Sequence, residues 1–307
     1  MNAFLDLDLV QLIAADLGVD ASFVEKDWYA MRIIAALITV DPLPVRLAFC
    51  GGTSLSKGFN AIERFSEDLD FKVILPPTGV NRNQRRSYRT QWVDAVRTGS
   101  SEWSIDDANI HSHNQGRFFD CQIIYQQNFE PATSLRHHIK LEVTFKSPAL
   151  PVEERSLQSF IAKANKHPPE VPLIACVSPI ETAADKLSAL TWRVLSRQRG
   201  QEGDDPTLIR HLYDLTALED EIVASENFTP LVVKLLDEDA KRGLDLSKIL
   251  PTERLQRMLQ CLEDDSVYED EYDRFVTGMS YAAENSRPSF ARAVTALRRL
   301  VKGISNN

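Results

Sequence analysis

The segment from Phe49 to Lys72 (FCGGTSLSKGFNAIERFSEDLDFK) constrains the fold of this chain more than any other part. An apolar strand runs into two consecutive glycines, and a helix is expected from Leu55 to about Ile62. Glycine lets the backbone turn sharply there, and the free N–H groups at the start of a helix suit a phosphate group. Such a turn alone is a weak indication, because most of them only connect two elements. The residues predicted to bind phosphate are Gly51, Gly52, Thr53, Ser54 and Lys57.

Two aspartates follow this unit on a predicted strand. Polar and apolar residues alternate in Asp68–Leu75, which places Asp68 and Asp70 on the same side. Two carboxylates this close repel each other unless a cation lies between them, and hard oxygen ligands suit Mg²⁺. Glu142, on the polar side of a later strand at 139–145, is the expected third ligand. The alternative is an exposed edge strand with solvated acids, but the preceding strand–turn–helix unit favours the metal site.

The rest of the chain divides into an α/β part and a helical part. Residues 7–40 are expected to be helical, and strands and helices mix from there to about residue 150. A short strand follows a proline-rich connector, and Ser178 and Pro179 then begin a helix with a capping box. Because the sequence beyond is helical to the end, we expect two domains, at 1–177 and 178–307.

Composition narrows the possible functions. No apolar stretch approaches the roughly 20 residues that span a bilayer. The four cysteines form no CxxC pair, so neither a cysteine metal motif nor a disulfide framework is indicated. The net charge of −9 argues against a surface built for nucleic acid, although the segment 81–97 carries five arginines and one aspartate. We expect a soluble, cytoplasmic protein that does not bind membranes.

The sequence resembles a known family at several points. The pattern GGTSLSKGF…ERFSEDLDF is similar to the AbiEii/AbiGii toxin family of bacterial nucleotidyltransferases, within the DNA polymerase beta-type superfamily. Further similar segments are VEKDWY at 24–29, IKLEV at 139–143, ETAADKLSAL at 181–190 and RHLYDL at 210–215. They occur in the family's order from about residue 24 to 218. The regions 76–135 and 219–307 match nothing in the pattern.

The resemblance implies a fold and a reaction. The fold is α+β: a mixed sheet flanked by helices, with an N-terminal helical segment and a C-terminal helical domain. The reaction is a two-metal transfer of a nucleotidyl group from an NTP to an acceptor hydroxyl, with release of pyrophosphate. Asp68 and Asp70 would bind both Mg²⁺ ions, and Glu142 would bind the ion that activates the acceptor. The glycine-rich turn would hold the triphosphate.

Lys186 and Asp214 are further catalytic residues implied by the resemblance. From spacing alone, Lys186 lies off the apolar stripe of its helix, so it could reach a phosphate or point into water. Asp214 lies four residues after Arg210, and the two could form an ordinary surface pair. His211 occupies a position where many relatives carry Asp. This leaves open whether Asp214 or His211 has the functional role.

In this family the acceptor is generally RNA, with tRNA favoured, and the expected consequence is a block of translation that a separately encoded antitoxin relieves. The basic segment lies between the second and third carboxylate strands, so its arginines are predicted to border the active site and contact RNA phosphates. The alternative is a solvated helix face. Two other functions stay open: nucleotidyl transfer to a protein or small-molecule hydroxyl, and a nucleotide-binding module without activity. The predicted RNA contacts are Arg82, Arg85, Arg86 and Arg89.

Overall fold

The computed structural model describes residues 5–40, 42–241 and 246–305. The chain forms two compact units. The first contains Met1–Asn60 and Phe65–Ser178, and the second contains Ala61–Arg64 and Pro179–Asn307. The sequence suggested a boundary after residue 177, but it did not indicate that 61–64 belongs with the C-terminal helices.

The first unit is built on one mixed sheet, which has eight strands in the described residues. The strand order is β3-β5-β6-β2-β1-β8-β7, and β4 pairs with β5. The pairs β2–β6 and β1–β8 are parallel, and the other pairs are antiparallel. The strands are β1 Arg46–Cys50, β2 Asp68–Ile74, β3 Trp103–Ser104, β4 Ile110–His113, β5 Phe118–Tyr125, β6 Ile139–Thr144, β7 Glu153–Leu157 and β8 Val171–Cys176.

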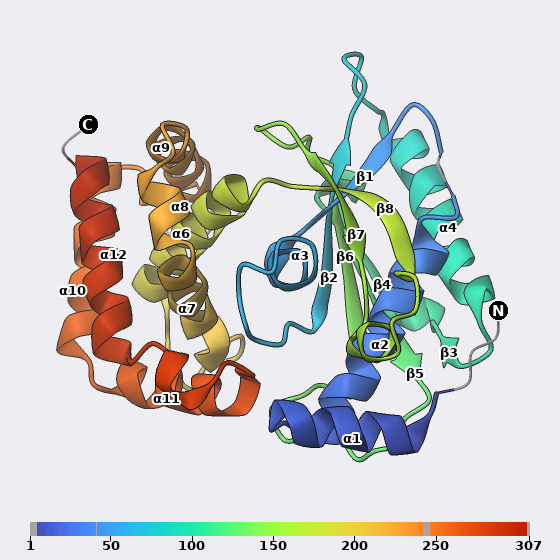
Figure 1. Cartoon of the computed structure of the whole chain (residues 1–307). Coiled ribbons are helices and arrows are strands. Elements are labelled where there is room, and N and C mark those ends of the chain that lie inside the picture. Colours follow the sequence, from blue (N-terminus) through green and yellow to red (C-terminus); the bar gives the residue numbers. More distant parts are fainter. Residues whose placement is uncertain (1–4, 41, 242–245, 306–307) are drawn as a thin grey trace. The chain divides into compact units, whose positions relative to one another are not determined.

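Helices cover the sheet of this unit on both faces (Figure 1). The helix α3 lies on one face, and α2 and α4 lie on the other. The helices of the unit are α1 Leu7–Leu17, α2 Ala21–Leu37, α3 Gly51–Lys57, α4 Arg82–Gly99 and α5 Phe160–Ala164. Short 3-10 turns occupy Asp107–Asn109 and Asn114–Gly116. The predicted mixed sheet with flanking helices is therefore confirmed.

The alternation of β2 explains this layering. Leu69, Phe71 and Val73 are buried in the core together with the apolar faces of α2 and α4. In that core the ring of Trp92, from α4, lies 5.7 Å from the ring of Phe145. Since successive strand residues point to opposite faces, the polar residues of β2 face away from α2 and α4.

Two predicted helix boundaries were wrong. The stretch 7–40 contains two helices rather than one, because Gly18 adopts a left-handed conformation with φ 65° and the side chain of Asp20 caps the next helix. The helix expected from residue 55 to 62 begins at Gly51 and ends at Lys57. Gly58 is its C-cap, and Asn60, two residues further on, has a left-handed φ of 51°.

The second unit is helical. The helix α6 begins at Pro179, as the capping pattern predicted. The segment 61–64 packs within this unit: the carbonyl of Glu63 accepts hydrogen bonds from the hydroxyl of Ser280 at 3.0 Å and from the amide of Tyr281 at 3.1 Å. The helices are α6 Pro179–Ser196, α7 Arg210–Ala217, α8 Glu219–Val223, α9 Phe228–Asp239, α10 Pro251–Asp264, α11 Val267–Met279 and α12 Phe290–Ser305, with 3-10 turns at Pro206–Ile209 and Glu284–Ser286.

Across the described ranges, no helix is long and apolar enough to cross a membrane.

Candidate active site

The register of three strands brings the predicted carboxylates onto one face of the sheet. Asp70 of β2 pairs directly with Glu142 of β6, and Glu142 pairs with Asp120 of β5. Directly paired residues of neighbouring strands project to the same side, and Asp68 shares that side because it lies two positions before Asp70. The result is an acidic face opposite the apolar core, made of Asp68, Asp70, Glu142 and Asp120.

Asp120 is the carboxylate that the sequence did not indicate. Asp120 is only 8% exposed. Its Oδ2 lies 3.4 Å from Nδ1 of His111, and its Oδ1 lies 3.6 Å from Nε2 of His113. It is flanked by the apolar Phe119 and Cys121, so it does not resemble a site residue in the linear sequence. Only the pairing of β5 with β6 reveals it.

Two of the predicted metal ligands are paired with basic side chains. Oδ1 of Asp68 accepts a hydrogen bond from Nη2 of Arg136 at 2.7 Å, and Oε1 of Glu142 lies 2.5 Å from Nζ of Lys140. Burial works to lower the pKa of Arg136, but Asp68 and nearby acids outweigh it and raise this pKa. The pKa of Lys140 is likewise raised, because the hydrogen bond to Glu142 outweighs burial. Both groups are therefore cations that offset part of the negative charge of the acidic face.

The donor set fits a divalent cation in its chemistry. Asp68, Asp70 and Glu142 are hard oxygen donors on adjacent strands in register, which is the kind of ligand that Mg²⁺ takes. As the side chains lie, no three His, Cys, Asp or Glu residues in the described part of the chain surround a point that could hold an ion. Asp68 and Glu142 are instead paired with Arg136 and Lys140.

The glycine turn packs directly against this acidic face. Gly51 has φ +76°, and a Cβ at this position would lie 2.0 Å from Oδ2 of Asp70. The hydroxyl of Thr53 donates to the carbonyl oxygen of Asp68 at 2.7 Å, and that of Ser54 donates to the carbonyl oxygen of Phe49 at 3.4 Å. Both hydroxyls thus fix the turn to β2 and β1. Phosphate binding by this turn stays a prediction.

Lys57 is buried rather than facing the turn. Its Nζ lies 2.6 Å from Oδ1 of Asp27 and 3.4 Å from the centre of the Phe160 ring. Asp27 also accepts a hydrogen bond from the amide of Phe160 at 2.8 Å. Burial lowers the pKa of Lys57 and raises that of Asp27, while their attraction opposes both shifts. Lys57 therefore links α3 to α2 and α5.

The neighbouring residues Glu25 and Lys26 of α2 also bind segments that lead into the site. Glu25 accepts hydrogen bonds from the backbone amides of Asn128 at 2.9 Å and Phe129 at 3.2 Å. Lys26 Nζ lies 2.5 Å from Oε2 of Glu67, one residue before Asp68. Burial lowers the pKa of Lys26 even though Glu67 opposes this shift. These buried charges tie α2 to the loop before β6 and to the start of β2.

In the second unit, Lys186 and Asp214 meet Arg64 in a buried cluster. Asp214 is fully buried and accepts hydrogen bonds from Nε and Nη2 of Arg64, both at 2.6 Å, while Nζ of Lys186 lies 2.6 Å from its Oδ2. The alternative of a surface pair between Asp214 and Arg210 does not occur, since Arg210 binds Asp205. Burial works to raise the pKa of Asp214, but the two cations lower it.

His211 is buried beside this cluster. Both of its ring nitrogens lack a hydrogen-bond partner within the described residues. Burial, together with nearby cations, lowers its pKa well below the ordinary value, so the ring is neutral. Of the two residues that the sequence left open, Asp214 is the one engaged in an ion-pair cluster.

Comparison with known proteins assigns the family. The family model described as "Nucleotidyl transferase AbiEii toxin, Type IV TA system" matches residues 32–296. The chain belongs to the AbiEii family. It is therefore an NTP-dependent nucleotidyltransferase and a toxin of a type IV toxin–antitoxin system, as the resemblance in its motifs predicted.

Solved structures agree at the level of the fold. The nucleotidyltransferase toxin MenT4 from Mycobacterium tuberculosis H37Rv is similar with a TM-score of 0.50 and 22% identity, over 94% of this chain and 98% of that one. A STING-associated CdnE c-di-GMP synthase from Capnocytophaga granulosa aligns over 97% of this chain and 87% of its own, at 13% identity. Its TM-score of 0.27 is too low to support an argument. No curated protein matches the sequence.

The predicted RNA-binding arginines of this AbiEii protein lie on α4. Because α4 packs on the apolar face, they lie on the opposite side of the sheet from the carboxylates, which they were expected to border. Arg85 has a structural role, since it donates to the carbonyl oxygens of Val80 at 2.6 Å and Gln115 at 3.1 Å. RNA binding stays a prediction for all four arginines: Arg82, Arg85, Arg86 and Arg89.

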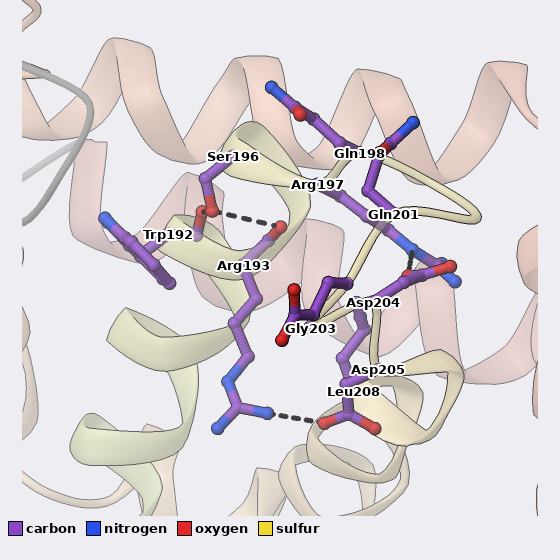
Figure 2. A pocket seen from close by; sticks show the side chains of 11 residues that line it. Trp192, Arg193, Ser196, Arg197, Gln198, Gln201, Gly203, Asp204, Asp205 and Leu208 are labelled. Atoms are coloured by element: carbon purple, nitrogen blue, oxygen red, sulfur yellow. Dashed lines mark hydrogen bonds and ion pairs between the residues drawn. The ribbon is translucent and has the colours of Figure 1, made fainter.

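The helical unit contains a cavity of about 590 Å³ near the end of α6. Figure 2 shows its charged side chains pointing toward one another: Arg193 pairs with Asp205 at 2.6 Å, and Arg197 pairs with Asp204 at 2.8 Å. These ion pairs connect the end of α6 to the loop that precedes the 3-10 turn at Pro206–Ile209.

Gly51→Ala tests the close packing of the turn on Asp70. The added Cβ meets Asp70 Oδ2 at 2.0 Å and the positive φ is strained, so we expect a loss of about 2–4 kcal/mol in the free energy of unfolding. Gly79→Ala is the matched control: its φ is +67°, but nothing lies within 4 Å of the added atom. Urea unfolding should show the larger loss for Gly51→Ala, and equal losses would contradict the close contact.

Asp214→Asn tests the buried ion cluster. It leaves Arg64 and Lys186 buried without their counter-charge, so we expect a loss of about 3–5 kcal/mol in unfolding free energy at pH 7. Because the pKa of Asp214 is lower in the folded state, its contribution is present above its unfolded pKa of about 3.9 and is lost as pH falls through the folded value. The variant should therefore lose less stability than the wild type on acidification below about pH 4.

Urea unfolding between pH 7 and pH 3 measures both effects. Glu253→Gln is the control, because Glu253 and its partner Arg257 both have exposed side chains, at 46% and 53%. Similar, small losses for the two variants at pH 7 would argue against a charged cluster at Asp214.

Proposed function

We propose that this AbiEii toxin transfers a nucleotidyl group from an NTP to an RNA hydroxyl, at the 3′ end of tRNA, and so blocks translation. The family establishes nucleotidyl transfer and a toxin–antitoxin role; the acceptor and the metal are the proposal. One observation carries it: the register that places Asp70 beside Glu142, with Asp68 on the same face.

The residues of the acidic face have distinct tasks in this proposal. Asp68 and Asp70 would hold two Mg²⁺ ions, and Glu142 would be a ligand of the ion that activates the acceptor. Bound Mg²⁺ supplies neutralisation of the triphosphate charge and a more acidic acceptor hydroxyl. The acceptor oxygen forms a bond to the α-phosphorus, and the bond to the leaving pyrophosphate breaks.

The glycine turn supports the proposal from the other side of Asp70. Its backbone at Gly51 approaches the carboxylate closely because this residue has no side chain. Thr53 and Ser54 hold it rigid, and we propose that backbone amides of the turn bind the triphosphate. Lys57 stabilises the position of this turn through its buried ion pair with Asp27.

Lys186 and Asp214 are proposed as functional residues of the second unit. The buried cluster with Arg64 supports a role in holding that unit, and Lys186 has its pKa lowered by burial. A cognate antitoxin is the expected protein partner of a member of this family.

The central test is a labelling reaction. Purified protein is incubated with total tRNA, Mg²⁺ and each of the four α-labelled NTPs, and the products are separated on a denaturing gel. We expect a labelled tRNA band, which Asp70→Asn reduces by more than about 100-fold, because losing a metal ligand costs more than the 10- to 100-fold of an outer-shell change. Asp94→Asn, an exposed acid on α4, is the control and should retain activity.

Other outcomes of that reaction are decisive too. Label on the protein fraction instead of tRNA would replace the proposed acceptor. Full activity of Asp70→Asn, or of the wild type in excess chelator, would overturn the metal site.

The arginines of α4 provide a separate test of RNA binding. Each phosphate contact contributes roughly 0.7–0.9 to the slope of log affinity against log salt. Replacing Arg82, Arg86 and Arg89 with alanine should therefore reduce the slope for tRNA by up to about 2–3, whereas Arg257→Ala, an exposed arginine of α10, should leave it unchanged. An unchanged slope in the triple variant would mean that α4 presents only a solvated face.

A further inference from the structure

Arg136 has a backbone that is fixed beside the acidic face. Its amide donates to Oε2 of Glu67 at 2.7 Å, and its carbonyl oxygen accepts from Nζ of Lys26 at 2.7 Å. Lys26 and Glu67 themselves pair at 2.5 Å, with side chains only 5% and 11% exposed. One buried ion pair, Lys26–Glu67, thus holds both the amide and the carbonyl group of Arg136. Glu67 of this pair directly precedes Asp68 in the chain.

The side chain of Arg136 is arranged differently from its backbone. It is 41% exposed, and its main contact is with Asp68, with Nε at a longer 3.6 Å from Oε1 of Glu67. A guanidinium has five donors in a planar fork, which suits phosphate as well as carboxylate. Since exposed ion pairs contribute little to stability, the guanidinium can leave Asp68 without disturbing the fold.

The charges of the site favour such an exchange. Asp68 is paired with Arg136 here, yet a carboxylate that binds a cation no longer needs this partner. The triphosphate of an NTP would bring several negative charges to the same place, and these need cationic partners. A guanidinium on a fixed backbone next to Asp68 can serve both states by rotating its side chain.

We propose that Arg136 is a triphosphate-binding residue that pairs with Asp68 until Asp68 binds a cation, and with the phosphates of the NTP from then on. Lys26 and Glu67 are positioning residues that hold the Arg136 backbone. This inference rests on the proposed function, because it takes Asp68 as a metal ligand and an NTP as the substrate.

If Arg136 exchanges partners in this way, Arg136→Ala should raise the affinity for Mn²⁺ and lower the affinity for tripolyphosphate. Binding of Mn²⁺ alone, measured by electron paramagnetic resonance, should tighten by about 3-fold or more, because no cation competes for Asp68. Binding of inorganic tripolyphosphate in excess Mg²⁺, measured by calorimetry, should weaken by about 10- to 100-fold, the loss typical of a hydrogen bond to a charged group. A residue that only stabilises the loop would weaken both.

Three further variants complete the experiment. Arg46→Ala removes another exposed arginine of the same unit, paired with Glu154, and should change neither affinity. Arg136→Lys keeps the charge and should recover part of the tripolyphosphate affinity, and it also serves as the test if the alanine variant does not fold. Lys26→Met loosens the Arg136 backbone and should weaken tripolyphosphate binding more than Mn²⁺ binding.

The outcomes separate this inference from the proposed function. If the wild type binds neither Mn²⁺ nor tripolyphosphate, or if Asp70→Asn leaves Mn²⁺ binding intact, the proposed metal site fails. If the wild type binds both ligands, Asp70→Asn loses Mn²⁺, and neither Arg136→Ala nor Arg136→Lys changes either affinity, the exchange is overturned while the proposed function stands.

Discussion

The first unit depends on the register of β2 between β1 and β6. One strand carries the apolar residues that bury α2 and α4 on one side and the two aspartates on the other. A shift by one residue would exchange these faces, burying Asp68 and Asp70 in the core and exposing Leu69 and Phe71. Folding and the acidic face are therefore set by the same pairing, because neither can change without the other.

Around this strand, buried charged side chains connect neighbouring segments through ion pairs and hydrogen bonds. Glu25, Lys26 and Asp27 lie on consecutive positions of α2, so they point in different directions and each reaches a different segment. One binds the loop before β6, one binds Glu67 and the third binds Lys57 of α3. Because an unpaired buried charge is costly, each contact is selective for its own partner. The helix thereby fixes three chain segments that converge on Asp68 and Asp70.

Local patterns predicted what local geometry determines. Period-two alternation was enough to place Asp68 and Asp70 on one side of a strand, since that depends only on neighbouring residues. It could not reveal Asp120, which reaches the acidic face through the pairing of β5 with β6, nor the partner of Asp214, which lies 150 positions away at Arg64. The family resemblance supplied the link between distant motifs, but not their contacts. Register and long-range ion pairs belong to the folded chain alone.

The cluster at Asp214 affects how changes in activity should be interpreted. Arg64 belongs to the second unit, where Asp214 holds it, yet it lies four residues before Asp68 in the chain. A substitution of Asp214 therefore releases the segment that leads into β2 as well as removing a charge. Loss of activity in such a variant does not by itself make the residue a substrate contact. A direct role requires a variant that keeps the Arg64 pair and the stability of the unit while nucleotide affinity falls.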